Sequence, residues 1–567
     1  MKQKLALSLT LSLLILSIQT SALGQEKTSA PGTGVAAGKS AGHTSIGRRA
    51  GRFNSVVAPV IEKDVEEALR LIQENYVDGR RLDYSQVFKS SILGMLRSLD
   101  PHSSYYDREE YEELKTEQRS EYFGIGASIQ NYLVRDTVDT YITSTFRGSP
   151  AWRSGLRYGD RIIAVDGVKV IGKSSLEVRN RIRGPRGSLV KVTVERSSDK
   201  KMQVVSITRD AVAQPSVPDA YMLKPGVGYI DMTRGFNYTT SDELREALEV
   251  LRANGASSLV LDLRNNPGGF LDQAIRVAEV FLPYGQLILT QKGRNGLRDN
   301  TYRSKNRSAD STPLVILIND STASASEIVA GAMQDHDRAL IVGETSFGKG
   351  LVQSIIPLDY GGGLTLTSAK YYTPSGRLIQ RDYADHGLYD YFTHGGSRRN
   401  DEKMKPVGPE RKTDTGRAVY GGGGITPDEP VNAREITTAQ RRLVSPLFAF
   451  TRDLVNGRIA GMGHYRVTGG INFGRELQDQ EYRIDQRTLK AFEDYLTAEP
   501  ALAHLVPLVQ RNRSFIQLQL RYNVVTAAYG RTMADRVLVV TEDEQIARAI
   551  EVLPRAKDLA MAAMSRR

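Results

Sequence analysis

Short continuous apolar runs alternate with amphipathic stretches through the middle of the chain. Residues 258–263 (SLVLDL) and 314–318 (LVILI) are almost entirely apolar, which is typical of strands buried on both faces. Residues 271–282 repeat their apolar positions at helical spacing, and the turn sequence NNPGG separates them from the first run. This order of strand, glycine turn and helix predicts an open α/β sheet, in which a crevice forms where strand ends meet.

Helical spacing dominates both ends of the chain. It occurs within residues 55–120 and again within residues 432–567, for example at 489–496 and 544–553. The C-terminal pattern has apolar faces and carries no chemical motif. It therefore fits an oligomerisation or adaptor-docking module, or else a simple helical appendage.

The first 24 residues have the layout of a secretory signal peptide. Lys2 and Lys4 precede a largely apolar run over 5–18, and small residues follow as far as Gly24. Because the apolar run is short for a membrane span, we expect an exported protein cleaved near Gly24, in a bacterial periplasm. An uncleaved sequence that attaches the protein to the inner membrane is the alternative.

Length, composition and charge limit the domain organisation and the kinds of partner that we expect. A length of 567 residues implies several domains, and the Gly-, Ala-, Ser- and Thr-rich residues 25–54 predict a flexible linker. The absence of cysteine excludes disulfides and a lipobox anchor. Net charge is +11, or +9 once Lys2 and Lys4 are removed, but acidic and basic residues are interleaved. We therefore expect no nucleic-acid partner.

A serine and a lysine 25 positions apart carry the main chemical signal. Ser324 lies in the sequence STASASEI, and Lys349 lies in SFGKGLVQ. A hydroxyl is a good nucleophile only when a base beside it accepts its proton, and a lysine does so only when burial lowers its pKa. Apolar neighbours such as Phe347 suit that burial. Gln353 lies four residues beyond Lys349, on the same face of a helix or strand, and is suited to orient the amine.

Backbone amides near the same serine suit an oxyanion hole. Gly268 and Gly269 end the first apolar run, and Ala325 follows Ser324 in a sequence typical of a helix N-terminus. We expect one of the two glycines and Ala325 to hold the oxyanion. A tight turn without chemical importance is the alternative for the glycines. The Ser-Glu pair that follows Ala325 is interpreted as shaping the first helical turn.

Four segments in this order resemble the carboxy-terminal processing, or tail-specific, serine proteases. They are LDLRNNPGG (261–269), ASASEIVAGA (323–332), FGKG (347–350) and YYTPSGRLIQ (371–380). The resemblance covers roughly residues 60 to 431. It implies a crotonase/ClpP-like α/β core that needs no cofactor, with Ser324 as nucleophile, Lys349 as general base and Gln353 as the orienting third member. Residues 381–420 depart from the simpler family pattern and predict an exposed loop insertion.

Residues 121–210 resemble a PDZ domain, with a glycine-flanked loop in the sequence FGIGASI. The resemblance implies that the amides of Ile125, Gly126 and Ala127 bind a terminal carboxylate while the next strand pairs with the peptide. The partners would then be proteins or peptides with apolar C-terminal tails. The domain is also expected to inhibit the enzyme until a tail binds.

Five further residues have open interpretations. Trp152 and Leu156 either line the PDZ pocket or fill that domain's core. Asp335 matches an acidic position of the family, and we expect an auxiliary or structural role. His336 offers a Ser-His-Asp alternative to its interpretation as a surface residue, and His102, in LDPHSSYY, is interpreted as part of a structural turn. No His or carboxylate cluster has metal-ligand spacing.

The predicted organisation is a signal peptide (1–24), a linker (25–54), an N-terminal helical segment (55–120), an inserted β-rich PDZ-like domain (121–210), a protease core (211–431) and a C-terminal helical region (432–567). We expect a multidomain α/β protein that acts as an exported serine endopeptidase, with an adaptor protein or a homo-oligomer as further partners. Two alternatives from other classes are a non-catalytic PDZ scaffold of the cell envelope and a crotonase-type enzyme acting on acyl thioesters.

Overall fold

The two apolar runs form neighbouring parallel strands, as their composition predicts. The computed structural model describes residues 57–117, 121–134, 137–383, 391–392, 408–478 and 480–565. The expected signal peptide and linker lie outside the described residues. The described chain divides into two compact units, which meet in sequence between Leu99 and Asp100.

The first unit is helical. It contains α1 (Val57–Asn75), the short 3-10 helix η1 (Gly79–Arg81) and α2 (Tyr84–Arg97). Asp83 begins α2, because its carboxylate accepts hydrogen bonds from the amides of Ser85 and Gln86.

A six-stranded sheet forms the centre of the second unit. Its strands, in spatial order, are β10 (Asp219–Lys224), β11 (Val227–Asp231), β12 (Ser258–Asp262), β15 (Leu314–Ile318), β16 (Ala339–Gly343) and β21 (Glu429–Pro430). Only β10 runs antiparallel to its neighbour. Leu261 lies opposite Ile316, and Ile316 lies opposite Ile341. The carboxyl ends of β12 and β15 are therefore adjacent, which brings the turns that follow them together.

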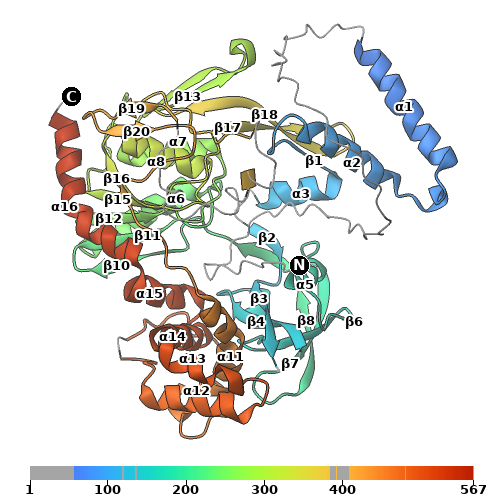
Figure 1. The fold of residues 1–567 in the computed structure, drawn as a ribbon, viewed down its shortest axis with the longest axis vertical. Helices are drawn as coiled ribbons and strands as arrows, with labels where there is room; N and C mark the ends of the chain where they lie inside the picture. The colour runs from blue at the N-terminus through green and yellow to red at the C-terminus, as the bar shows by residue number, and fades with distance from the viewer. Residues whose placement is uncertain are drawn as a thin grey trace, which may run out of the picture. The chain divides into compact units, whose positions relative to one another are not determined.

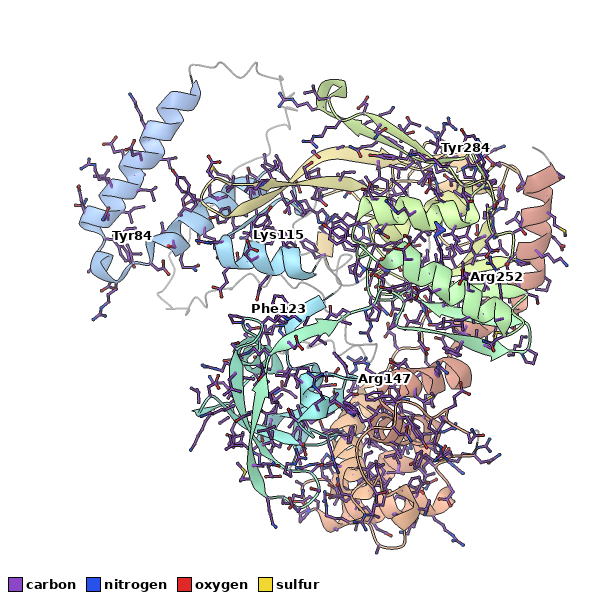
Figure 2. All side chains as sticks on the ribbon, turned by 180° about the vertical axis from the view of Figure 1, so that it is seen from behind. Tyr84, Lys115, Phe123, Arg147, Arg252 and Tyr284 are labelled. Carbon is purple, nitrogen blue, oxygen red and sulfur yellow. The ribbon has the colours of Figure 1, made fainter. Side chains whose placement is uncertain are left out.

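Helices cover both faces of this sheet (Figure 1). One face packs against α6 (Thr240–Ala253), α7 (Leu271–Phe281) and α8 (Ala325–Asp335), and the other against α16 (Glu544–Ser565). Leu261 and Ile316 are fully buried between these layers, and each such side chain contributes roughly 1.5–3 kcal/mol. Arg252, labelled in Figure 2, lies near the end of α6 and donates to the carboxylate of Asp310 at 2.6 Å.

A second, five-stranded sheet carries the segment after Lys349. It consists of β1 (Ser104–Tyr106), β13 (Leu287–Gly293), β14 (Asn300–Arg303), β17 (Leu351–Pro357) and β18 (Gly363–Tyr372). The helix α3 (Arg108–Glu117) follows β1, and the 3-10 helix η2 (Arg294–Gly296) connects β13 to β14. The hairpin of β17 and β18 returns the chain to the turn that holds Lys349, because Leu351 pairs with Lys370.

A β-rich region covers the segment in which the PDZ-like domain is expected. Its elements are β2 (Glu121–Gly124), β3 (Ala127–Val134), β4 (Thr137–Thr145), α4 (Pro150–Arg153), β5 (Arg161–Val165), β6 (Val168–Lys169), α5 (Ser175–Ile182), β7 (Leu189–Glu195), β8 (Met202–Thr208) and β9 (Asp210–Ala213). The main sheet has the order β3-β4-β5-β7-β8, so β3 is an edge strand. A capping box between Ser174 and Glu177 begins α5.

Helices fill most of the region after the protease core. They are α11 (Thr438–Leu454), η3 (Gly463–Tyr465), α12 (Gln486–Ala498), η4 (Ala503–Leu505), α13 (Val506–Arg511), α14 (Arg513–Tyr529) and α15 (Arg531–Glu542). A small hairpin of β19 (Glu410–Lys412) and β20 (Ala418–Tyr420) precedes β21 in the chain. No helix within the described part of the chain is long and apolar enough to cross a membrane.

The PDZ-like region and these helices share one apolar core. Phe448 of α11 stacks on Tyr132 of β3, with ring centroids 3.7 Å apart and planes 1° from parallel. Tyr141 and Tyr158 contact the same ring. Arg452 adds polar links, donating to the carbonyl of Gly159 at 2.7 Å and pairing with a carboxylate of the PDZ-like region. The two regions therefore pack as one body.

Candidate active site

Ser324 lies at the N-cap of α8, immediately beyond β15, in a strained backbone conformation. Its φ is 56° and its ψ is −115°, a region that residues other than glycine rarely adopt. Its side chain is placed to accept the Glu327 amide as in a capping box, and among the described residues its hydroxyl proton is donated to no acceptor. The hydroxyl of this half-buried serine is thus left available for chemistry.

The glycine turn after β12 lies directly against Ser324. A side-chain carbon added to Gly268 would lie 2.8 Å from both the Ser324 Cβ and the amide nitrogen of Ala325. Ala325 is the first residue of α8, where backbone amides lack partners within the helix. The predicted glycine turn and the predicted helix N-terminus therefore face each other across a space that only glycine leaves open.

The two glycines differ in how their amides are used. The amide of Gly268 donates to the Asn266 side chain at 2.9 Å. At Gly269 the contact with Phe236 uses the Gly268 carbonyl and the Phe270 amide, so the Gly269 amide takes no part in it. Gly269 and Ala325 therefore have the amides better suited to receive an oxyanion.

Lys349 lies in the turn between β16 and β17, between two buried glycines. Burial lowers the pKa of Lys349 to about 8, against the opposing charges of Asp100 and Glu327, which favour the ammonium form. About a tenth of the amine is thus neutral at pH 7, far more than for a lysine in water. Desolvation is the physical condition that the sequence predicted for a lysine base.

Glu327 joins the serine and lysine segments. One carboxylate oxygen accepts the amides of Ser324 and Lys349, each at 2.8 Å. The other accepts the Gly348 amide at 2.7 Å and the Ser346 hydroxyl. Burial raises the pKa of the fully buried Glu327, and the four hydrogen bonds oppose that rise. The sequence interpretation gave Glu327 only a role in the helical turn; its spacing from Ser324 is a capping pattern that reveals no distant partner.

Tyr371 supplies a second link between the same segments. Its hydroxyl lies 3.0 Å from the Ser324 carbonyl oxygen and 2.7 Å from the Lys349 carbonyl oxygen. Tyr371 is buried on β18, and sequence reasoning gave it no role beyond its family motif. A buried tyrosine that needs a hydrogen-bond partner was the only available signal.

Gln353 lies on β17, and its side-chain amide donates to the Thr367 hydroxyl at 3.2 Å. Within the described residues, no hydrogen bond joins its side chain to Lys349. Its predicted role of orienting the amine is therefore not visible in this geometry.

His336 and Asp335 lie at the far end of α8 from Ser324, about 16 Å along an 11-residue helix. His336 uses both ring nitrogens, one with Asp414 at 2.8 Å and one with the Leu287 carbonyl at 2.7 Å. The Ser-His-Asp alternative is therefore excluded. The interpretation of His336 as a surface residue is wrong as well, because its ring is buried with partners on both nitrogens. Asp335 forms a buried ion pair with Arg377, consistent with a structural role.

The loop before β3 turns its amides away from the protein interior. The Gly126 carbonyl accepts from the Phe146 amide at 3.0 Å and from the Ser149 hydroxyl at 2.8 Å, and the Ile125 carbonyl accepts from the Ala151 amide at 2.7 Å. In a trans peptide the following N–H points opposite to the carbonyl, so the amides of Gly126 and Ala127 point outward. Phe123, labelled in Figure 2, marks the strand that leads into this loop.

The two candidate pocket residues of the PDZ-like region have different surroundings. Leu156 is buried in that region's core. Trp152 is 38% exposed and packs edge-on against Phe473, from the C-terminal region. No group of three or more His, Asp or Glu side chains among the described residues is arranged to hold a metal ion.

Comparisons with known proteins agree with this architecture. A sequence model of peptidase family S41 matches residues 226–386, and one of the PDZ domain matches residues 141–196. A carboxy-terminal-processing protease of Bartonella bacilliformis is 38% identical over 307 residues, which are 53% of this chain and 68% of that protein. A carboxyl-terminal-processing protease of Synechocystis sp. is 37% identical over 315 residues, 55% of this chain and 72% of that protein. The solved structure of a photosystem II D1 C-terminal processing protease is 26% identical, with a TM-score of 0.34. The match covers 65% of this chain and 92% of that protease.

The chain is therefore a serine-type peptidase with a PDZ domain. It belongs to peptidase family S41, with the carboxy-terminal-processing proteases.

Proposed function

We propose that the protein is an endopeptidase in which Ser324 is the nucleophile and Lys349 is the general base. The observation that carries the proposal is the Glu327 carboxylate, which accepts the backbone amides of both residues at 2.8 Å. This shared acceptor fixes two segments 25 positions apart in one place. The lowered pKa of Lys349, to about 8, supplies an amine able to take the serine proton.

The reaction follows from these roles. Neutral Lys349 takes the proton of the Ser324 hydroxyl as the oxygen bonds to the scissile carbonyl carbon. The carbonyl oxygen becomes an oxyanion, stabilised by the amides of Gly269 and Ala325, with Gly268 giving the turn its shape. The Lys349 ammonium then protonates the leaving amine as the C–N bond breaks. Lys349 next takes a proton from water as the water oxygen bonds to the acyl carbonyl carbon. The Lys349 ammonium then returns that proton to the Ser324 oxygen as the acyl C–O bond breaks, which restores the free serine and the neutral lysine.

In this proposal the Gln353 side-chain oxygen orients Lys349 when substrate is bound; in the free protein the hydrogen bond to Thr367 uses only the NH2 group. Active-site hydrogen bonds are often formed only in the complex. The finer assignment of the core to a crotonase/ClpP-like fold rests on its parallel sheet and the strand–turn–helix segments that bear Ser324 and the glycine turn.

The PDZ domain binds the C-terminal tail of the substrate in this proposal. The outward amides of Gly126 and Ala127, with that of Ile125, receive the terminal carboxylate, and the edge strand β3 pairs with the tail. Apolar last residues are favoured. From the resemblance and the sequence pattern, we further propose that the protein is exported to the periplasm and that the C-terminal helices serve an adaptor or a homo-oligomer.

The test compares the chain from residue 25 onward with its Ser324→Ala variant. Each is incubated with an unstructured protein that has an apolar C-terminus, and with a copy that ends in charged residues. Cleavage by the parent alone, faster for the apolar tail, supports both parts of the proposal. Tail binding without cleavage by the parent would instead identify a PDZ scaffold.

A further inference from the structure

A cluster of buried and half-buried side chains lies against the Lys349 turn. Its members are His102, Phe347, Gln380, Arg381 and Tyr391. Tyr391 belongs to the predicted insertion at 381–420, of which the structure describes 381–383, 391–392 and 408–420. Its side chain is only 1% exposed. An insertion that was expected to form an exposed loop therefore contributes a buried residue beside the candidate base.

A chain of hydrogen bonds runs from Lys349's neighbour to Tyr391. The Gln380 side-chain oxygen accepts the Gly350 amide at 2.8 Å, which orients its NH2 group toward the Tyr391 hydroxyl, 3.1 Å away. That hydroxyl also lies 2.7 Å from the His102 Nε2. Because the NH2 group can only donate, the tyrosine oxygen accepts from Gln380, and its own proton is free for His102.

His102 is neutral in this arrangement. Burial, followed by the charge of Lys349, lowers the pKa of His102 to about 3, against the opposing charge of Asp100. A neutral imidazole accepts a hydrogen bond from the Tyr391 hydroxyl and adds no positive charge beside Lys349. The interpretation of the His102 turn as structural did not foresee this proximity.

Aromatic rings also pack around the Lys349 turn. The Phe347 ring lies 5.5 Å from that of Tyr391 and 6.4 Å from that of His102. The guanidinium of Arg381 lies 4.9 Å from the centre of the Phe347 ring, and the Arg381 amide donates to the Gly348 carbonyl at 2.8 Å. The charged or titratable groups around Lys349 are thus Asp100, His102, Glu327, Arg381 and Tyr391, with Tyr371 at its carbonyl.

We propose that Tyr391 is a positioning residue that holds the Lys349 turn through Gln380 and keeps the amine out of water together with His102. This rests on the proposed role of Lys349 as base. Through Tyr391, the insertion at 381–420 thereby helps to position and desolvate the proposed base. Without the Tyr391 ring, water reaches the Lys349 amine and solvates its ammonium form. The pKa of Lys349 then rises.

The experiment measures kcat/KM against pH for the chain from residue 25 onward and for three variants. Tyr391→Ala removes ring and hydroxyl, Tyr391→Phe removes the hydroxyl alone, and Tyr360→Ala is the control, at a tyrosine that is 97% exposed. We expect the midpoint of the rising limb to move upward by about one unit or more in Tyr391→Ala, which is about a tenfold loss near neutral pH that is regained at high pH. We expect a smaller shift in Tyr391→Phe and none in Tyr360→Ala.

A uniform loss of activity at every pH, with an unmoved midpoint, would overturn the proposal, because a merely structural role lowers the active fraction equally. A second measurement does not depend on turnover. The pH dependence of Lys349 acetylation by acetic anhydride, followed by mass spectrometry in the Ser324→Ala background, reports the amine directly. An upward shift there in Tyr391→Ala, in a chain that proves inactive, would uphold the positioning role while the proposed function fails; no shift would reject the positioning role itself.

Discussion

Four hydrogen-bond donors converge on the Glu327 carboxylate in this active site. Glu327 receives the amides of Ser324, Gly348 and Lys349 and the hydroxyl of Ser346. A buried carboxylate that satisfies four donors is costly to replace, since each donor to a charged acceptor contributes about 1.5–3 kcal/mol.

We expect Glu327→Gln to lower kcat by roughly 10- to 100-fold with little change in KM, because the amide presents an NH2 group to donors that need an acceptor. Steady-state kinetics on a tail-bearing protein measures this. Ser346→Ala, which removes one donor and leaves the carboxylate, is the matched control with a smaller loss. Equal effects of the two changes would argue against a role of the Glu327 carboxylate in holding the Ser324 and Lys349 segments together.

The proposed base gives a pH dependence with a definite sign. Lys349 accepts a proton only when neutral, and its pKa of about 8 makes the neutral form scarce below that value. We expect kcat/KM to rise about tenfold per pH unit below pH 7 and to level off above pH 9. A rate that falls with increasing pH over this range would contradict a lysine base.

Strain at Ser324 predicts a difference between two inactive variants. Ser324→Ala keeps a side chain at a φ of 56° and a ψ of −115°, whereas Ser324→Gly relieves the strain. Relief of roughly 1–3 kcal/mol exceeds the added entropy of the unfolded glycine chain, about 0.4–1 kcal/mol. We expect the glycine variant to be more stable than the alanine variant by about 1 kcal/mol in urea unfolding. The reverse order would show that the serine backbone is unstrained.

At the scale of elements, the glycine turn after β12 and the start of α8 form the reaction centre. A side-chain carbon at Gly269 would lie 2.1 Å from the Phe236 carbonyl oxygen. The turn must therefore move if any side chain is added.

We expect Gly269→Ala to reduce kcat by roughly 100-fold or more, because one oxyanion donor is displaced. Gly255→Ala is the matched control: its φ is 84°, but no atom lies within 4 Å of the added carbon. This control should lose about 1 kcal/mol of stability and no activity. Comparable losses of activity in both variants would mean that the Gly269 turn has no particular role.

The sequence predicted the strands and the helix around the reaction centre. It did not predict the hydrogen bonds that join these segments to one another. The runs at 258–263 and 314–318 form β12 and β15, and the amphipathic segment between them forms α7. Their composition and period carry that information locally. The links made by Glu327, Tyr371 and Tyr391 depend on which distant segments meet, and a single sequence does not encode that in any local pattern. Ser324 and Lys349 were recognised from their chemistry and from family motifs.

At the scale of the molecule, the PDZ domain and the C-terminal helices share a core around Phe448. A PDZ domain joined to its neighbours in this way moves only together with them. Any regulation by tail binding would then involve α11 as well as the edge strand β3.

We expect Phe448→Ala to destabilise this combined body by about 3–5 kcal/mol, because a buried ring leaves a cavity. Hydrogen exchange should increase together in β3 and α11 and stay unchanged in β12 and β15. Tyr360→Ala, at a residue 97% exposed, is the control and should change neither. Faster exchange in α11 alone would show that the two regions are independent.

The backbone of Ser324 has an evolutionary consequence. A lineage that no longer needs proteolysis gains folding free energy by placing glycine at this position, whereas a lineage that keeps proteolysis must keep the strained serine. Drift after loss of function should therefore leave a recognisable trace at residue 324. Sequences of this architecture that carry glycine there would be expected to retain tail binding and to have abandoned cleavage.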